Sequence, residues 1–469
     1  MYHSSRPVHR NLFLLCFGAL LLTLSGCQGY QNFYWYVCKS TGYYTPFCTR
    51  PPASETHLFP EQPVPSPSSN QFSPERKLLG EKLFFDPILS RDQTVSCATC
   101  HQPHHAYADP NQFSTGIGGQ TGSRNSISLL NAAYQRHVFF DGRTGSLEQQ
   151  AREPMFNSLE MGNLRCRLNK DENEEKHDCV PIQQEDLDDK MRDAIQRGDI
   201  IVRDKVEVVT DRLKGNHEYR ELFKNAFDHD IQAASPKETF TLILQAIASF
   251  ERTLTSTDSL FDQWVKEEAP ISWKAQRGWR LFFGKARCSL CHIPPTYSDG
   301  DFHNLGVPRV IKQDGEEVED KGRASFLDQH PQSQAPGEFL QPLRPPTYEI
   351  RQEQVGQAEV RPKQERQSDR REKVHNFWEP FGMDACAYKT PSLRNVEHTD
   401  PYMHTGAFKR LEDVVRFYVN GGGKTPCGEK DWRIQKLDLD STEQGYIVEF
   451  LKTLSGTKVP PGVPPPTLE

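Results

Sequence analysis

The stretch "VSCATCHQPHHAYAD", residues Val95–Asp109, has two cysteines separated by two residues and followed directly by a histidine. The pattern recurs as "CSLCH" at Cys288–His292. In a C-x-x-C-H motif both thiols add to the vinyl groups of a c-type haem, and the histidine binds the iron from one side. The alternatives are a zinc knuckle or a redox C-x-x-C, which need further nearby thiols or a thioredoxin-like context that the sequence lacks. The two motifs therefore predict two covalently bound haems.

Each motif supplies two attachment cysteines and one iron ligand. The predicted haem-binding residues are Cys97, Cys100 and His101 in the first motif, and Cys288, Cys291 and His292 in the second. His104 and His105 follow His101 so closely that the chain has little length to reach the far face of the ring. They are candidate iron ligands, but a surface or propionate-contacting role is the expected one.

The N-terminus has the pattern of an export signal. Arg6 and Arg10 precede the apolar run "NLFLLCFGALLLTL", which ends in "LSGC" at Cys27. This resembles a bacterial lipobox and predicts a signal peptide over 1–27 with Cys27 lipidated. An ordinary signal peptide or a short membrane anchor is the alternative. The Pro/Ser-rich residues 28–72 predict an extended tether, so we expect a periplasm-facing protein that meets the membrane only through its lipid.

Cysteine content and charge agree with export. The cysteines not assigned to signal, lipid or haem are even in number, which suits disulfides outside the cytosol. They permit fifteen connectivities, and pairing of nearest neighbours is our prediction: Cys38 with Cys48, Cys166 with Cys179, and Cys386 with Cys427. The net charge of −7 and the pI near 6.2 argue against nucleic acid as a partner and would suit a basic electron donor.

Apolar periodicity predicts a mainly α fold in two lobes. "SPERKLLGEKLFFDP" starts a helix with Ser73 as N-cap, and "KETFTLILQAIASFERTL" and "STEQGYIVEFLKTLSG" show similar apolar spacing. Strand-like alternation is scarce, and no internal repeat is evident beyond the two haem motifs. The predicted domains are 73–235, with an insertion at 163–190, and 236–469, with an insertion at 314–373 that is predicted to be disordered or loosely packed.

Several longer segments carry a family resemblance. The segments "LGEKLFFDPILSRDQTVSCATCH", "SRNSISLLNAAY", "FFDGRTGSLEQQAREP", "SFERTLTS", "FHNLGVP", "KTPSLRNVEHTDPYMHTGAF" and "FLKTLSG" together resemble the bacterial di-haem cytochrome c peroxidase and MauG family. The resemblance runs in order from about Ser73 to Gly456, apart from the two insertions. It implies two cytochrome c-like helical domains packed face to face. Peroxide would react at the N-terminal haem, and the C-terminal haem would relay or store oxidising equivalents.

The resemblance predicts that the first haem has an open coordination position. Peroxidase members place a distal histidine seven residues before an Arg-Asn pair, and here the pair is Arg124-Asn125 and the position is Ile117. Isoleucine cannot ligate iron, so a five-coordinate haem is expected.

Family spacing assigns three residues to the distal side of this haem: Gln150, Pro154 and Glu160. Glu160 is the candidate acid/base, and Gln150 is a hydrogen-bond donor to bound oxygen. Without the resemblance, Glu160 would be a solvated surface residue.

For the second haem, the family places methionine or, in MauG-like members, tyrosine in the helix after a P-Y-x-H-x-G turn. The matching residue is Tyr418, with Met403 and His404 as competing ligands and a core tyrosine as the structural alternative. A phenolate stabilises oxidised iron, which suits storage of an oxidising equivalent.

Two further family positions can be matched. Phe140 stands where the family has an inter-haem tryptophan, so hole hopping through this position is expected to be lost, leaving direct tunnelling or another aromatic such as Tyr402. A calcium site between the domains is implied, and its matching residues are Asn125, Thr399 and Pro401.

The sequence thus predicts a di-haem enzyme that reduces hydrogen peroxide with electrons from a small cytochrome c or cupredoxin. The alternative enzyme is a MauG-like oxidase that modifies a partner protein. A non-catalytic electron carrier is the alternative from a different class, but the missing sixth ligand and Glu160 would have no role in it.

Overall fold

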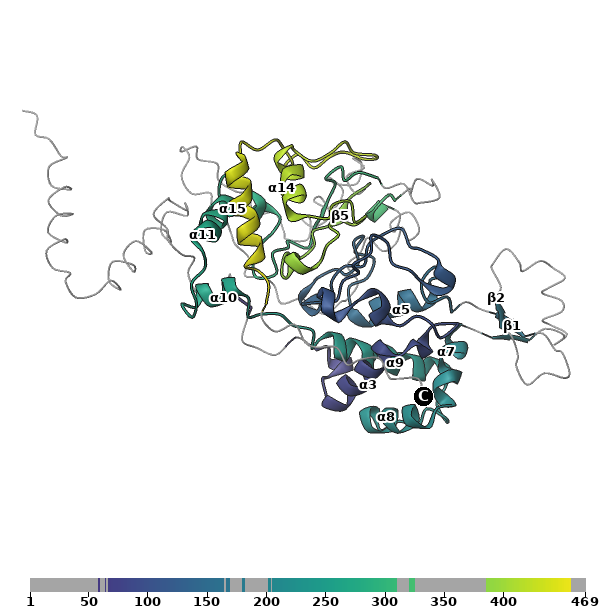
Figure 1. The fold of residues 1–469 in the computed structure, drawn as a ribbon. Helices are drawn as coiled ribbons and strands as arrows, with labels where there is room; N and C mark the ends of the chain where they lie inside the picture. The colour runs from purple at the N-terminus through teal and green to yellow at the C-terminus, as the bar shows by residue number, and fades with distance from the viewer. Residues whose placement is uncertain are drawn as a thin grey trace, which may run out of the picture. The chain divides into compact units, whose positions relative to one another are not determined.

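A computed structural model describes residues 58–59, 64, 66–163, 166–168, 179–181, 201–203, 205–309, 320–324 and 385–456, all within one compact unit spanning 55–469 (Figure 1). These residues are mainly helical with two small sheets, which confirms the predicted fold class. The predicted signal peptide, lipidated Cys27 and most of the tether lie outside the described residues. Asn70, near the end of the predicted tether, is buried and donates to Glu148 Oε1 at 2.8 Å. No helix among the described residues is both long and apolar enough to cross a membrane.

The helices before residue 252 form the first cluster. They are α3 (Pro74–Phe85), α4 (Cys97–Cys100), α5 (Leu147–Phe156), α7 (Lys205–Lys214), α8 (His217–Phe227) and α9 (Pro236–Glu251). Helix α3 starts as predicted, because Ser73 Oγ accepts from the Arg76 N–H and Pro74 occupies the first turn. Helix α9 packs against α3, α5 and α7 (Figure 1), and buried Leu83, Ala151 and Ile243 belong to their shared core.

A second cluster follows. Its helices are α10 (Leu260–Val265), α11 (Trp273–Phe283), α14 (Leu411–Val419) and α15 (Ser441–Lys452). Helix α11 packs along α15 (Figure 1), and its core contains buried Trp279, Phe282 and Phe450. Short 3₁₀ helices connect the main elements: η1 (Ser68–Asn70), η2 (Pro87–Leu89), η3 (Pro103–His105), η4 (Ile117–Gly119), η5 (Ala132–Tyr134), η7 (Cys288–Leu290) and η8 (Val396–His398).

Two antiparallel sheets were not predicted. The strands are β1 (Cys166–Leu168), β2 (Cys179–Pro181), β3 (Ile201–Arg203), β4 (Phe302–His303) and β5 (Tyr388–Lys389), paired in the orders β2-β1-β3 and β4-β5. Strands β1 and β2 belong to the predicted insertion 163–190 and bring the segments of Cys166 and Cys179 together.

One predicted disulfide is confirmed. Cys386 is bonded to Cys427, with their Cα atoms 5.6 Å apart. Cys38 and Cys48 lie outside the described residues, and the pairing of Cys166 with Cys179 stays a prediction. The four cysteines of the haem motifs carry no disulfide, which leaves their thiols available for haem attachment.

The two clusters are built from one repeated plan, which the sequence analysis missed. Each contains a helix with the motif G-x-x-L-F-F, at Gly80–Phe85 in α3 and at Gly278–Phe283 in α11. At each glycine the helix crosses the last helix of its cluster closely. A Cβ at Gly80 would lie 1.9 Å from the carbonyl oxygen of Ala246 in α9, and one at Gly278 would lie 1.8 Å from that of Tyr446 in α15. Only glycine permits either crossing without displacement.

The repeat continues after each haem motif. Both halves contain S-L-x-N, whose asparagines Asn131 and Asn395 share a left-handed conformation with φ of 60°. Each asparagine N–H donates to the leucine carbonyl of an F-x-x-T-L motif, at Leu254 and Leu454; the motif starts inside α9 or α15 and runs past its C-terminal end.

The repeat shifts the boundary between the two lobes, which the sequence analysis placed between residues 235 and 236. Helix α9 closes the first repeat, as α15 closes the second. We therefore propose that the first lobe extends through α9 and that the second begins at α10 or α11.

Candidate haem and peroxide sites

The proximal histidines have equivalent surroundings. His101 Nδ1 lies 3.1 Å from the carbonyl oxygen of Tyr107, and His292 Nδ1 lies 2.8 Å from that of Tyr297. A backbone acceptor at Nδ1 fixes the proton there and leaves Nε2 for iron. Burial lowers the pKa of both imidazoles, so both stay neutral at neutral pH, which is the form that binds a metal. The motif residues therefore fit haem attachment on both sides.

The distal residues predicted for the first haem come from helix α5 and the turn after it. Gln150 and Pro154 are one turn apart in α5, so they share one side of the helix. Gln150 is buried, and its Oε1 has no hydrogen-bond partner. An unpaired buried amide oxygen is costly, and such atoms are typical of ligand-binding sites.

Glu160 is held in the turn that follows. Asn157 Nδ2 donates to Glu160 Oε1 at 2.5 Å, and the Glu160 carbonyl accepts from the Ile117 N–H at 2.9 Å. Burial raises the pKa of the Glu160 carboxyl, although Arg143 and the bond from Asn157 lower it. The Glu160 charge in turn raises the pKa of Cys100, after the larger effects of burial and Asp109. Glu160 thus lies close to the first haem motif.

Ile117 stands where a distal histidine would be. Its side chain is buried in the apolar core of the first lobe, beside Met161 and Ala151. In contrast, His105 Nε2 lies 2.5 Å from the carbonyl oxygen of Asp400, which engages the nitrogen that would bind iron. Neither residue offers the first haem a sixth ligand.

The repeat gives one pair of equivalent positions after the haem motifs, one in each lobe. Gly142 and Gly406 have positive φ and follow Phe140 and His404 by two residues. An isolated β-bridge joins the residue four before each glycine to the residue two after it: Val138 to Thr144 and Tyr402 to Phe408. A helix, α5 or α14, begins five residues after each glycine. Twelve residues after each glycine, the first lobe has Pro154 and the second has Tyr418.

Tyr418 lies near its haem motif. Burial raises its pKa, and the Cys291 and Cys288 charges add to the shift. His404, a competing ligand, is instead equivalent to Phe140, and its ring is stacked on Tyr388 at 3.5 Å between centroids. The repeat therefore favours Tyr418 over His404 as the residue facing the second iron.

A charged group adjoins the second motif. His303 lies 2.8 Å from Asp431 through Nδ1 and 2.9 Å from Asp299 through Nε2. His303, Asp299 and Cys291 are the grouping among the described residues whose ligand atoms are close enough for a metal ion. Both ring nitrogens of His303 face carboxylates, and the Arg433 Nη2 also lies 2.8 Å from Nδ1, so charged neighbours hold the ring on both sides.

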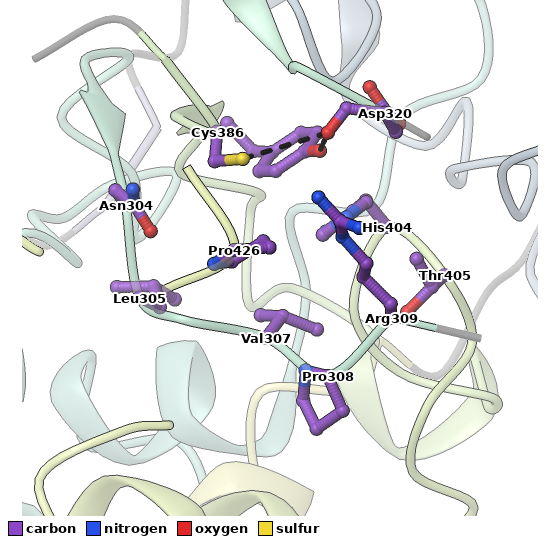
Figure 2. A pocket seen from close by; sticks show the side chains of 11 residues that line it. Asn304, Leu305, Val307, Pro308, Arg309, Asp320, Cys386, His404, Thr405 and Pro426 are labelled. Carbon is purple, nitrogen blue, oxygen red and sulfur yellow. Dashed lines mark hydrogen bonds between the residues drawn. The ribbon is translucent and has the colours of Figure 1, made fainter. Parts of the chain in front are cut away.

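Aromatic and charged side chains join the lobes. The Phe140 ring meets the His404 ring edge-on, with 6.3 Å between the ring centroids. Burial lowers the pKa of His404 to about 3. Arg124 binds Asp320 through two bonds of 2.6 and 2.8 Å, although Asp320 belongs to the predicted loose insertion. Figure 2 shows His404 and Asp320 lining one pocket. Tyr388 also lines it, and no sequence signal singled out this residue.

The predicted calcium residues come from segments that meet. Asn125 donates from its backbone to the His404 carbonyl at 2.8 Å, and its Nδ2 donates to the carbonyls of Asp109 and Asn111. With Nδ2 turned toward these carbonyls, Oδ1 is the side-chain atom of Asn125 suited to a hard cation. Thr399 and Pro401 flank Asp400, the partner of His105. The calcium site stays a prediction.

Comparison with known proteins decides the family. Residues 74–270 match the family described as di-haem cytochrome c peroxidase. The cytochrome-c peroxidase IdrP1 of Denitromonas iodatirespirans is 31% identical over 404 residues, covering 86% of this chain and 87% of that protein. The chain belongs to the di-haem cytochrome c peroxidase family. As a member, it is an oxidoreductase with two c-type haems.

Other relatives fall in both branches of the family. The methylamine utilization protein MauG of Methylorubrum extorquens is 29% identical over 392 residues, covering 83% of this chain and 81% of that protein. The diheme peroxidase BthA from Burkholderia thailandensis has a similar fold, with a TM-score of 0.57 at 18% identity, covering 89% of this chain and 97% of that one. A MauG-like protein associated with microbial copper homeostasis has a TM-score of 0.56 at 24% identity, covering 85% and 95%.

Proposed function

We propose that this enzyme reduces hydrogen peroxide to water at its first haem and takes electrons from a small periplasmic cytochrome c or cupredoxin. The observation that carries the proposal is the equivalence of Pro154 and Tyr418 in the two repeats. Proline has no side-chain donor, so the first lobe keeps its distal side open where the second offers a phenol. Relatives named cytochrome-c peroxidase support the substrate and the kind of donor.

In this proposal a bound haem supplies an iron that accepts the oxidising equivalents of peroxide, and the distal residues move protons. Glu160 takes the proton of the near oxygen on its carboxylate and returns it to the far oxygen, so that water is the leaving group. Its raised pKa suits this exchange, because the carboxyl holds a proton more readily than an exposed glutamate. The Gln150 amide orients the bound oxygen from the same side.

In the second lobe, His292 and the Tyr418 phenolate would hold the haem iron, and a haem bound there would relay or store oxidising equivalents. A phenolate is a hard anionic donor and favours the oxidised iron. Phe140 packs between the lobes as a spacer, and a calcium ion held by Asn125 and the carbonyls of Thr399 and Pro401 would fix their contact. The lipidated Cys27 would hold the protein at the periplasmic face of a membrane.

A MauG-like oxidase is the second candidate. The tyrosine at position 418 favours it, because stabilised high oxidation states suit slow oxidation of a protein side chain. One assay separates the two candidates: the haem-loaded enzyme is given peroxide with either a reduced small cytochrome c or a panel of periplasmic proteins. Turnover with the small donor supports the peroxidase. Product formed only on a protein side chain would support the oxidase.

A further inference from the structure

We propose that the electron donor docks on the exposed side of α11 and η7, and that this donor is a small redox protein with an acidic, partly apolar surface around its cofactor edge. The donor face comprises Trp273, Arg277, Arg280, Arg287, Leu290 and Ile293. The proposal rests on the proposed function and names the chemistry of its partner.

The first part of the donor face is one side of α11. Trp273, Arg277 and Arg280 are spaced four and three residues apart, so they lie on the same side of the helix. Trp273 is 63% exposed, and its ring packs edge-on against Tyr446 at 5.3 Å. The indole is thus held in place while its outer surface stays open. Exposed tryptophan and arginine are the side chains most often central to protein interfaces.

The second part surrounds the second haem motif. Arg287 directly precedes Cys288, and the Leu290 N–H donates to its carbonyl at 3.2 Å. Leu290, between the attachment cysteines, is 50% exposed, and Ile293, directly after His292, is 38% exposed. The donor face therefore extends from the start of α11, a helix about 15 Å long, to the point of haem attachment. A partner here would place its cofactor near the second haem.

The donor face is basic, whereas the whole chain carries a net negative charge. Residues 272–293 contain five basic side chains and no acidic one, in a chain with a net charge of −7. Glu443 pairs with Lys285 at 2.8 Å, which neutralises one of the five. Burial and the nearby Arg277 guanidinium both lower the pKa of Arg280, so like charges adjoin on the face. Such a surface attracts an acidic partner and speeds its association.

The first lobe supplies an internal comparison. Aligned on the repeated glycine, α3 has Glu75 where α11 has Trp273, and Leu79 where α11 has Arg277. Leu79 is fully buried, and α8 packs against α3, whereas the described helix packed along α11 is α15. Lys82 matches Arg280, but Glu75 and the buried Leu79 stand where Trp273 and Arg277 are, so the shared backbone does not require these two members of the donor face.

The test measures binding by calorimetry with the haem-loaded enzyme, using an acidic cupredoxin and a basic cytochrome c as probes. We expect the cupredoxin to bind more tightly, and its affinity to fall as salt rises. The double variant R277E/R287E should weaken cupredoxin binding at least about tenfold at low salt, and W273A should weaken it at all salt concentrations. The matched control K224E/K237E makes the same charge change on exposed lysines of α8 and α9 and should leave the affinity within about twofold.

Tighter binding of the basic cytochrome, equal affinity in R277E/R287E and the parent, or equal weakening by the control would each overturn the proposal. Turnover with hydroquinone, a neutral small donor, separates this proposal from the proposed function. Docking variants should keep that turnover. Absence of peroxide turnover in the unmodified enzyme with every donor would count against the proposed function instead, whatever the binding results.

Discussion

Pro154 and Tyr418 hold the same place in two copies of one structural plan, yet they offer iron different chemistry. Both lie twelve residues after a glycine with positive φ, on helices that begin with Leu-Glu. A pyrrolidine ring has no donor atom, and a phenol becomes a strong anionic ligand once it loses its proton. Under the proposed function, this difference between the repeats would distinguish the reacting site from the storing site.

Glu160 gives the first prediction. Glu160→Gln keeps the size of the side chain and the hydrogen bond to Asn157, but it cannot exchange a proton. The reaction with peroxide should slow by about two to four orders of magnitude, with both haems still bound. Rapid-mixing spectroscopy measures the rate, and Glu153→Gln, a half-exposed carboxylate paired with Arg152, is the control.

The pH dependence of the rate of reaction with peroxide tests the same residue in a second way. Glu160 must be deprotonated to accept a proton, so the rate should fall as pH drops through its pKa. Because burial raises this pKa above the ordinary 4.5, the acidic limb should lie at a higher pH than for an exposed glutamate, and Glu160→Gln should abolish it. A limb that persists in the variant would assign it to another group.

Tyr418 gives the second prediction. Tyr418→Phe should open the second iron to added ligands such as cyanide or imidazole and change its absorption and EPR spectra, while the first haem keeps its own. The physical reason is that phenylalanine occupies the same space without an oxygen donor. If the second haem is unaltered in the variant, the sixth ligand must come from Met403 or His404.

At the scale of elements, each half of the molecule contains one close helix crossing at a glycine. Gly80 lets α3 approach α9, and Gly278 lets α11 approach α15. Helices α3 and α11 precede the haem motifs in the chain, and α9 and α15 follow them. Burial of Phe84 and Phe282 at the equivalent positions shows that both copies use the same packing.

The third prediction concerns such a crossing. In Gly278→Ala the new methyl group would lie 1.8 Å from the Tyr446 carbonyl oxygen, so α11 and α15 must separate. The free energy of unfolding should fall by about 1–3 kcal/mol. Gly445 of α15 has no neighbouring atom within 4 Å, and Gly445→Ala should be neutral or stabilising by up to about 1 kcal/mol. Thermal unfolding of both haem-loaded variants compares them, and equal loss would contradict the crossing argument.

At the scale of the whole molecule, the sequence predicts covalent chemistry better than long-range packing. The haem motifs and the Cys386–Cys427 bond could be anticipated because thiol chemistry leaves local patterns. The association of α9 with α3 could not, since apolar periodicity shows that a face is buried but not against what. The repeat G-x-x-L-F-F, S-L-x-N and F-x-x-T-L was readable but was overlooked, and it would have shown both the lobe boundary and the equivalence of Pro154 and Tyr418.

Contacts between the lobes were the least predictable part. Asp320 anchors Arg124 from within a segment whose composition predicts disorder, and Tyr388 reaches His404 from a strand of two residues. Composition averages over a segment, so it does not detect a single buried ion pair inside it. The contacts between the lobes around Phe140 therefore could not be predicted from the sequence.

The last prediction concerns activation of the whole enzyme. Where a peroxidase of this family has a distal histidine on its first haem, that ligand must leave before peroxide can bind, and reduction of the other haem triggers its departure. Here Ile117 is buried in an apolar core, His105 is bonded to Asp400, and Pro154 has no donor, so none of these three side chains has to leave. The all-ferric enzyme should therefore react with peroxide at once, and prior reduction should give no acceleration. Rapid mixing of the diferric protein with peroxide, with and without one equivalent of reductant, tests this. Reaction only after reduction would mean that another residue ligates the first iron, and the assignment of an open site would be wrong.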